Sequence, residues 1–177
     1  MHNKIPPIFT FISEFKKEEI LKLNKNVAII FRNYIKLPNK RMILEIKKFC
    51  KKEGRKIFLA NNFKLAVDTN LDGVYIPSFN KSLNLRKFNY RKNFAILGSA
   101  HNMKEIRIKE KQGVEAIFIS PLFRNKNYKK NLGIVRFNIL SRLTNKKIIA
   151  LGGINKNNIN KLKITNAYGF SGISYFN

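Results

Sequence analysis

Short apolar segments recur along the chain, each bounded by Asn, Gly, Pro or Ser. Eight such segments, rich in β-branched and aromatic residues, lie at residues 7–12, 27–31, 56–60, 73–76, 94–98, 116–120, 147–151 and 169–174. Apolar runs of this length and composition are typical of buried strands rather than helices. The pattern therefore predicts eight buried strands.

The segments between these runs have helical periodicity. In residues 39–54, apolar side chains recur on one helical face, and Gly54 follows as the expected C-cap. Asn102 and Gly113 are placed to begin and end a second helix. Residues 16–23 indicate a brief helix, and residues 155–167 show similar helical spacing.

Strands that alternate with helices indicate parallel βαβ units, and eight such units predict a closed (β/α)8 TIM barrel. An open doubly wound sheet is the alternative. The chain has 177 residues, fewer than the roughly 250 typical of this barrel. We expect the shorter length to come from a short first helix and from the lack of a final C-terminal helix. We expect a single barrel domain over residues 1–177.

Composition narrows the protein class. Hydrophobic residues make up 44% of the chain, which argues against a disordered segment. One cysteine, Cys50, excludes an internal disulfide and fits a reducing compartment. No apolar run reaches the roughly 20 residues needed to span a bilayer, and the N-terminus lacks the layout of a secretory signal. The expectation is a cytoplasmic globular protein without membrane association.

The net charge is unusual. The chain carries 36 Lys and Arg against 10 Asp and Glu, a formal charge of +26. Such an excess indicates an anionic partner or a coding sequence biased toward lysine and asparagine. The lysines are spread along the chain, which favours compositional bias with incidental polyanion binding.

A Gly-Gly pair follows the seventh predicted strand. In such barrels the chemistry lies at the carboxyl ends of the strands, and phosphate groups often bind after strands 7 and 8. The backbone N–H groups of Gly152 and Gly153 are placed to bind an anion that a side chain would exclude. The alternative is a tight turn that requires a positive φ.

The stretches "ILGSAHNMKEIRIKEKQGVEAIFISPLFRN" (96–125) and "IIALGGINKNNINKLKITNAYGFSGIS" (148–174) resemble the thiamine phosphate synthases and their thiazole tautomerase relatives. The order and spacing of Gly-Ser-Ala-His, Ser-Pro-Leu-Phe, Ala-Leu-Gly-Gly-Ile and Gly-Ile-Ser carry the resemblance over about half of the chain. The first half of the chain fits this family more loosely. The resemblance also implies a (β/α)8 barrel.

The resemblance implies a transferase of thiamine biosynthesis. Such an enzyme joins hydroxymethylpyrimidine diphosphate to thiazole phosphate, forming thiamine phosphate and releasing diphosphate. Ser99 matches the serine near the reacting centre, and Arg32 matches a diphosphate-binding arginine. The implied substrate-binding residues are Asn61 at the pyrimidine or diphosphate, Gly152 and Gly153 at the thiazole phosphate, and Ile173 and Ser174 on its other side. His101 is expected to be structural.

The chain departs from the family at several positions. Asn62 and Asn80 stand where the family has Mg²⁺-binding aspartates, and Tyr34 replaces a lysine. Pro121 takes the place of the tautomerase histidine, so that chemistry lacks its acid–base group. No two of the ten carboxylates converge on the expected active face, and Mg²⁺ prefers carboxylate oxygen. We therefore expect no protein-built metal site, and Mg²⁺ only as an ion chelated by the substrate.

The loop after the sixth predicted strand is basic. It carries Arg124, Lys126, Lys129 and Lys130, which we hypothesise to offset diphosphate charge in place of a metal. The alternative is a solvated basic loop.

Three functions remain open: a divergent thiamine phosphate synthase, a catalytically impaired barrel or tautomerase-like protein that binds phosphorylated ligands, and a basic nucleic-acid binder. The resemblance favours the synthase, with phosphorylated small molecules as substrates. A homo-oligomer that covers the exposed eighth strand is left open.

Overall fold

The computed structural model describes residues 5–84, 89–124 and 130–176 and contains one closed barrel of parallel strands. Neighbouring strands pair in sequence order, and β8 pairs with β1. The strands are β1 (Ile8–Ile12), β2 (Val27–Phe31), β3 (Ile57–Ala60), β4 (Gly73–Ile76), β5 (Ala95–Ala100), β6 (Ala116–Ile119), β7 (Lys147–Leu151) and β8 (Gly169–Ser171). The predicted (β/α)8 barrel is confirmed. The strands at 27–31, 73–76 and 147–151 coincide with their predicted ranges, whereas β5 ends two residues later and β8 three residues earlier than predicted.

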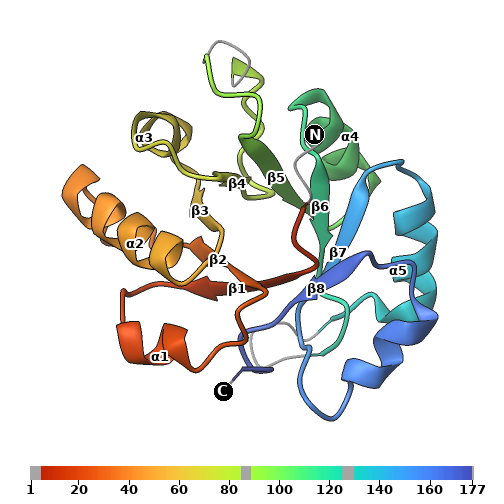
Figure 1. Cartoon of the computed structure of the whole chain (residues 1–177). Helices are drawn as coiled ribbons and strands as arrows, with labels where there is room; N and C mark the ends of the chain where they lie inside the picture. The colour runs from red at the N-terminus through yellow and green to blue at the C-terminus, as the bar shows by residue number, and fades with distance from the viewer. Residues whose placement is uncertain (1–4, 85–88, 125–129, 177) are drawn as a thin grey trace.

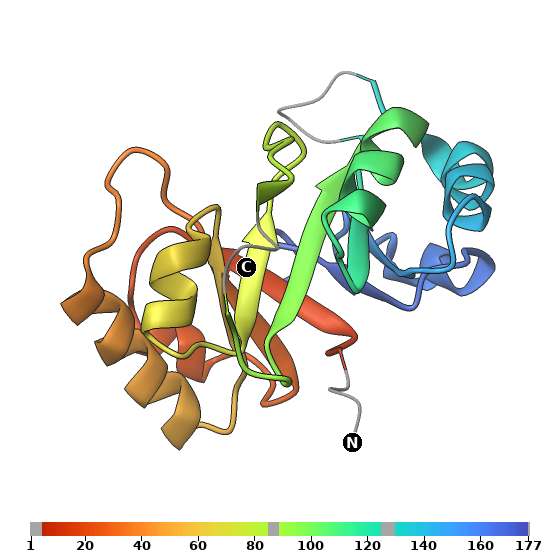
Figure 2. The same ribbon diagram turned by 90° about the horizontal axis from the view of Figure 1, so that it is seen from above.

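Helices surround the strands (Figures 1 and 2). They are α1 (Lys17–Leu21), α2 (Lys40–Lys52), α3 (Phe63–Asp68), α4 (Met103–Lys111), α5 (Gly133–Arg142) and the 3-10 helix η2 (Ile159–Ile164). Asn39 and Asn102 cap the starts of α2 and α4, because their side-chain oxygens accept hydrogen bonds from the backbone N–H three residues later. The predicted cap at Asn102 is confirmed, and Gly54 has the positive φ expected of a C-cap.

The helical spacing over residues 155–167 produces only the 3-10 helix η2. Asparagine side chains explain this difference. Asn155 Oδ1 accepts from the backbone N–H groups of Asn157 and Asn158, and Asn158 Oδ1 accepts from Asn155 N–H. These local bonds compete with an α-helical start. After β8, the described chain to Phe176 forms no further helix, as the sequence predicts.

Aromatic rings fill the interior of the barrel. Phe118 on β6 lies 5.0 Å from Phe9 and 5.3 Å from Tyr75 between ring centroids, in edge-to-face geometry. Phe58 packs on Phe9 at 5.8 Å. Small side chains in the same cluster leave room for these rings: Ala28, Ala60, Ala95 and Ala116. A barrel of eight strands is just wide enough for such side chains to fill, so the interior is a packed core.

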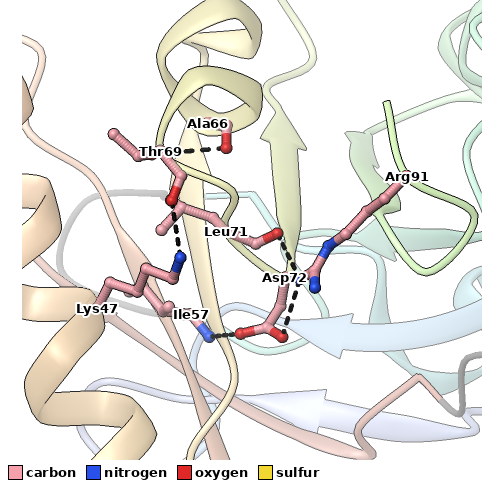
Figure 3. Close-up of polar contacts among 7 residues, drawn as sticks. All are labelled: Lys47, Ile57, Ala66, Thr69, Leu71, Asp72 and Arg91. Atoms are coloured by element: carbon pink, nitrogen blue, oxygen red, sulfur yellow. Dashed lines mark hydrogen bonds and ion pairs between the residues drawn. The ribbon is translucent and has the colours of Figure 1, made fainter. Parts of the chain in front are cut away.

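The amino-terminal ends of β3 and β4 are joined by polar contacts (Figure 3). The Asp72 carboxylate accepts a hydrogen bond from Ile57 N–H at 2.9 Å and pairs with Arg91 at 3.6 Å. Arg91 also donates to the carbonyl of Leu71, and Lys47 on α2 donates to that of Thr69. These bonds stabilise the end of the barrel opposite the expected active face.

In the described ranges, no helix is long and apolar enough to cross a membrane.

Phe118→Ala should lower the free energy of unfolding by about 3–5 kcal/mol, because it opens a cavity between three rings that cannot all collapse. Chemical denaturation measures this loss. Val135→Ala, at a side chain on α5 that is 73% exposed, is the control and should change stability by about 0.5 kcal/mol or less. Equal losses in the two variants would contradict the interior packing role of Phe118.

Candidate active site

The carboxyl ends of the strands direct polar side chains toward the mouth of the barrel. Side chains alternate along a strand, so the residue two positions after an interior side chain has the same direction. Ile30 lies in the interior cluster and precedes Arg32 by two residues, and Leu97 is related to Ser99 in the same way. Both residues that the sequence predicts to be catalytic are therefore on inward-facing positions at the mouth.

A cavity of about 510 Å³ opens at this mouth. It is lined by six residues predicted to form the site: Arg32, Arg124, Gly152, Gly153, Ile173 and Ser174. Its wall also includes Phe11, Ser120, Asn155 and Ser171, which the sequence analysis did not identify. Strand alternation could have identified two of these residues. Phe11 stands two residues after the interior Phe9, and Ser171 is at the carboxyl end of β8. The predicted phosphate-binding residues thus share one cavity with two arginines.

Arg32 is supported by the barrel core. Its guanidinium lies 4.4 Å from the centroid of the Phe11 ring, and its backbone N–H donates to the carbonyl of Ile12 at 2.8 Å. The Phe11 ring in turn packs on Tyr75 at 5.1 Å. A cation over an aromatic face is attracted by the ring quadrupole. Arg32 is therefore held at the mouth by the ring and the backbone, and no carboxylate of the described residues pairs with it.

Protein backbone occupies the space that a side chain would need at the two glycines. A Cβ atom on Gly152 would lie 2.8 Å from Pro121 Cα, and one on Gly153 would lie 2.5 Å from the carbonyl oxygen of Phe123. Both glycines also have positive φ, 93° and 70°. The loop after β6 packs directly on them, so the tight-turn explanation accounts for the glycines. Their role as a phosphate site stays a prediction, and both face the cavity.

Asn61 and Asn80 meet on the rim near β3 and β4. The Asn80 side-chain amide donates to Asn61 Oδ1 at 2.7 Å. Asn61 has a φ of 57°, a left-handed conformation that asparagine tolerates. Neither asparagine lines the 510 Å³ cavity, and neither does Ser99, which is only 4% exposed. The structure therefore places the expected pyrimidine-side residues beside the cavity rather than in its wall.

His101 links three strand ends. Its Nδ1 lies 2.8 Å from the carbonyl oxygen of Ser120, and its Nε2 lies 3.1 Å from Ser78 Oγ. Nδ1 also lies 3.2 Å from Ser120 Oγ. The imidazole joins the loop after β4 to the end of β6, in keeping with the structural role expected for it.

A buried lysine lies behind the rim. Lys109 on α4 is fully buried, and its ammonium donates to the carbonyls of Pro77 and Asn80 and to Gln112 Oε1, each at 2.8 Å. Burial lowers the pKa of Lys109 to about 8, while the nearby Glu105 carboxylate acts in the opposite direction. The sequence analysis did not single out this residue.

The basic loop after β6 is described only in part. Arg124 lines the cavity with an exposed side chain, and Lys130 is also exposed. Lys126 and Lys129 lie outside the described residues, as do Asn125 and Asn127. The hypothesis that this loop offsets diphosphate charge stays a prediction.

The residues at the expected metal positions do not fit Mg²⁺. Asn62 Oδ1 accepts from Leu65 N–H and caps α3, and Asn80 Oδ1 accepts from Ser82 N–H. Their side-chain oxygens are thus already used, and neither is charged. Among the described residues, no group of three His, Cys, Asp or Glu side chains is placed to hold a metal. Hard cations prefer carboxylate oxygens, and neither Asn62 nor Asn80 supplies one.

The model of one protein family, described as thiamine monophosphate synthase, matches residues 17–176. The chain belongs to this family. A putative thiamine-phosphate synthase 2 from Aquifex aeolicus is 29% identical over 77% of this chain and 74% of its own length. A thiamine-phosphate synthase from Prochlorococcus marinus is 29% identical over 85% of this chain but only 45% of its own length. The resemblance inferred from the quoted motifs is confirmed.

The fold agrees with this family. A thiamine phosphate pyrophosphorylase from Pyrococcus furiosus superposes with a TM-score of 0.77 over 97% of this chain and 90% of its own length, at 17% identity. At this identity the likeness is one of fold. Members of the family are transferases, which confirms the class of enzyme expected from the sequence.

The buried Lys109 generates a prediction on stability. Its pKa is about 8 in the folded protein against an ordinary 10.5, so between these values the unfolded chain binds a proton that the folded chain has lost. Stability contributed by this group therefore rises with pH over that range. Denaturation at pH 7 to 10 should show the wild type gaining stability relative to Lys109→Met. The exposed-site control Lys111→Met should follow the wild type. Parallel curves for wild type and Lys109→Met would contradict the assignment.

Proposed function

We propose that this protein is a thiamine phosphate synthase that joins hydroxymethylpyrimidine diphosphate to thiazole phosphate with a site that contains no protein-bound metal. Family membership supports the reaction, and the cavity lined by Arg32, Arg124, Gly152 and Gly153 carries the assignment of the site. In this reaction the C–O bond between the pyrimidine methylene and diphosphate breaks. The thiazole nitrogen then forms the new C–N bond, and diphosphate leaves with the bonding electron pair.

The arginines meet the charge that develops on the leaving group. Arg32 is held over Phe11, so its guanidinium is oriented before substrate binds. Preorganised charge of this kind stabilises a leaving anion without the cost of reorganisation. Arg124 faces the same cavity from the loop after β6. Ser99, buried at the end of β5, is assigned to the reacting centre on the strength of the family motif.

The phosphate of the thiazole is assigned to the opposite wall of the cavity. Gly152 and Gly153 follow β7, and Ile173 and Ser174 follow β8. A bound phosphate at this wall would face Arg32 across the cavity. The two substrates would then meet between the β2 and β7 sides of the mouth.

Metal enters this proposal only with the substrate. Because the rim presents amides where carboxylates are expected, Mg²⁺ would be carried by the diphosphate and supply charge neutralisation there. Phosphorylated small molecules are the proposed substrates, and binding to other polyanions is incidental. The single thiol, Cys50, is buried with its pKa raised to about 12 by burial, consistent with a structural residue in a cytoplasmic protein.

The amide substitutions also favour a second candidate, a barrel that binds these ligands without turnover. A coupled assay with both substrates separates the two. Thiamine phosphate should form in the wild type. Thiamine phosphate that accumulates with time and with enzyme concentration would support the synthase. Binding of thiazole phosphate without formation of this product would support the non-catalytic barrel.

Arg32→Gln should lower kcat/KM by about a hundredfold, the usual scale for removing one preorganised charged group. Steady-state kinetics with varied pyrimidine diphosphate measures the loss. Arg41→Gln, at an exposed arginine on α2, is the matched control and should retain wild-type rates. An Arg32→Gln enzyme as active as the control would remove Arg32 from the proposed mechanism.

Metal removal provides a further test. Since no group of three ligating side chains occurs among the described residues, activity in chelator should fall only by the contribution of substrate-bound Mg²⁺, and added Mg²⁺ should not bind to the protein alone. Isothermal titration of the substrate-free protein with MgCl₂ checks the second point. Stoichiometric, tight Mg²⁺ binding without substrate would overturn the metal-free site.

A further inference from the structure

The loop after β4 is held from behind by Lys109 of α4 and by Gln112, the residue that follows this helix. Lys109 donates to the carbonyls of Pro77 and Asn80, and Gln112 Nε2 donates to the carbonyls of Asn80 and Ser82 at 2.9 Å. Lys109 and Gln112 also bond each other at 2.8 Å and are at most 1% exposed. A charged group this deeply buried is costly unless all its donors are used, and here all three are.

The barrel makes room for the lysine. Gly98 on β5 lies against its aliphatic stem, where a Cβ atom would come within 2.8 Å of Lys109 Cδ. Val114 packs at the same point, 3.0 Å from that Cβ position. The stem thus runs between α4 and β5 and delivers the ammonium to the underside of the loop.

The same loop makes two contacts across the rim. Asn80 donates to Asn61, and the Phe79 ring packs edge-to-face on Tyr34 with centroids 5.6 Å apart. Tyr34 stands two residues after Arg32 in the segment that follows β2. Burial raises the pKa of Tyr34, and the charge of Arg32 opposes that change. The loop therefore reaches the surroundings of Arg32 through Tyr34 and those of β3 through Asn61.

We propose that Lys109 is a positioning residue of the active site, holding the loop after β4 so that Asn80 and Phe79 meet Asn61 and Tyr34 beside Arg32. This role rests on the proposed function. The ammonium takes no part in the reaction and touches no substrate. It supplies two fixed hydrogen bonds to a loop that has no helix or strand of its own between Pro77 and Ser82, and a third to Gln112, which itself bonds the loop.

The first test separates the two substrates. Lys109→Met should raise KM for the pyrimidine diphosphate by about tenfold, the scale expected when a buried hydrogen-bond anchor is lost. KM for thiazole phosphate should stay within about twofold, because Gly152, Gly153 and Ser174 lie on the other side of the mouth. Lys111→Met is the matched control on the exposed face of α4. Equal increases in both KM values would assign Lys109 to general stability and overturn the proposal.

A double-mutant cycle tests whether Lys109 acts through Asn80. Asn80→Ala should raise the same KM, and adding Lys109→Met should increase it little further, since both changes remove one arrangement. Fully multiplicative effects would show that the two residues act independently.

Hydrogen exchange tests the loop without relying on turnover. Amide exchange over residues 77–84 should accelerate at least about tenfold in Lys109→Met and remain unchanged in α2 and β7. If Lys109→Met does not fold, Gln112→Leu removes two bonds to the same loop and should accelerate exchange there. Unchanged loop exchange in a folded variant would overturn the proposal. A wild type without turnover would refute the proposed function alone, and loop exchange would still decide the role of Lys109.

Discussion

The rest of the structure depends on the aromatic packing inside the barrel. Eight strands enclose a space that must be filled, and Phe9, Phe58, Tyr75 and Phe118 fill it with edge-to-face contacts. Phe11 extends this packing toward the mouth of the barrel: its ring contacts Tyr75, and the guanidinium of Arg32 lies over it. Among the described contacts, the guanidinium of Arg32 is therefore positioned by core packing rather than by an ion pair. The packing that stabilises the fold also keeps the charge of Arg32 available to an anion.

The electrostatics of the mouth follow from what is absent around Arg32. In the described part of the rim, amides at Asn62 and Asn80 occupy the places where the family resemblance implies carboxylates. Two fewer negative charges near two arginines leave the mouth more positive. A more positive mouth attracts a diphosphate more strongly but binds a divalent cation less well. The site is thus suited to a substrate that supplies most of the negative charge itself.

Much of the fold was predictable because its signals are local. The buried strands are short apolar runs such as 27–31 and 147–151, and the predicted cap at Asn102 depends only on its side chain and the next turn. The segment 155–167, expected to be helical, forms only a short 3-10 helix because the side chains of Asn155 and Asn158 accept hydrogen bonds from the local backbone. The cavity residues Arg32 and Gly153 were predictable from motifs at strand ends. Phe11 and Ser120 were not singled out, because their role depends on which strands become neighbours.

Lys109 illustrates the limit of sequence reasoning most clearly. In the sequence it stands among charged residues of α4, where a lysine is expected on a solvated face. Only the tertiary structure brings Gly98 beneath its stem and three acceptors to its ammonium. A metal held by carboxylates from two strand ends would fix those ends by charge. Here the Asn61–Asn80 bond joins the rim from the front, and Lys109 and Gln112 hold the same loop from behind. Hydrogen bonds on both sides of one loop can thus fix its geometry without a metal, and the proposed function assigns neutralisation of the diphosphate to Arg32 and Arg124.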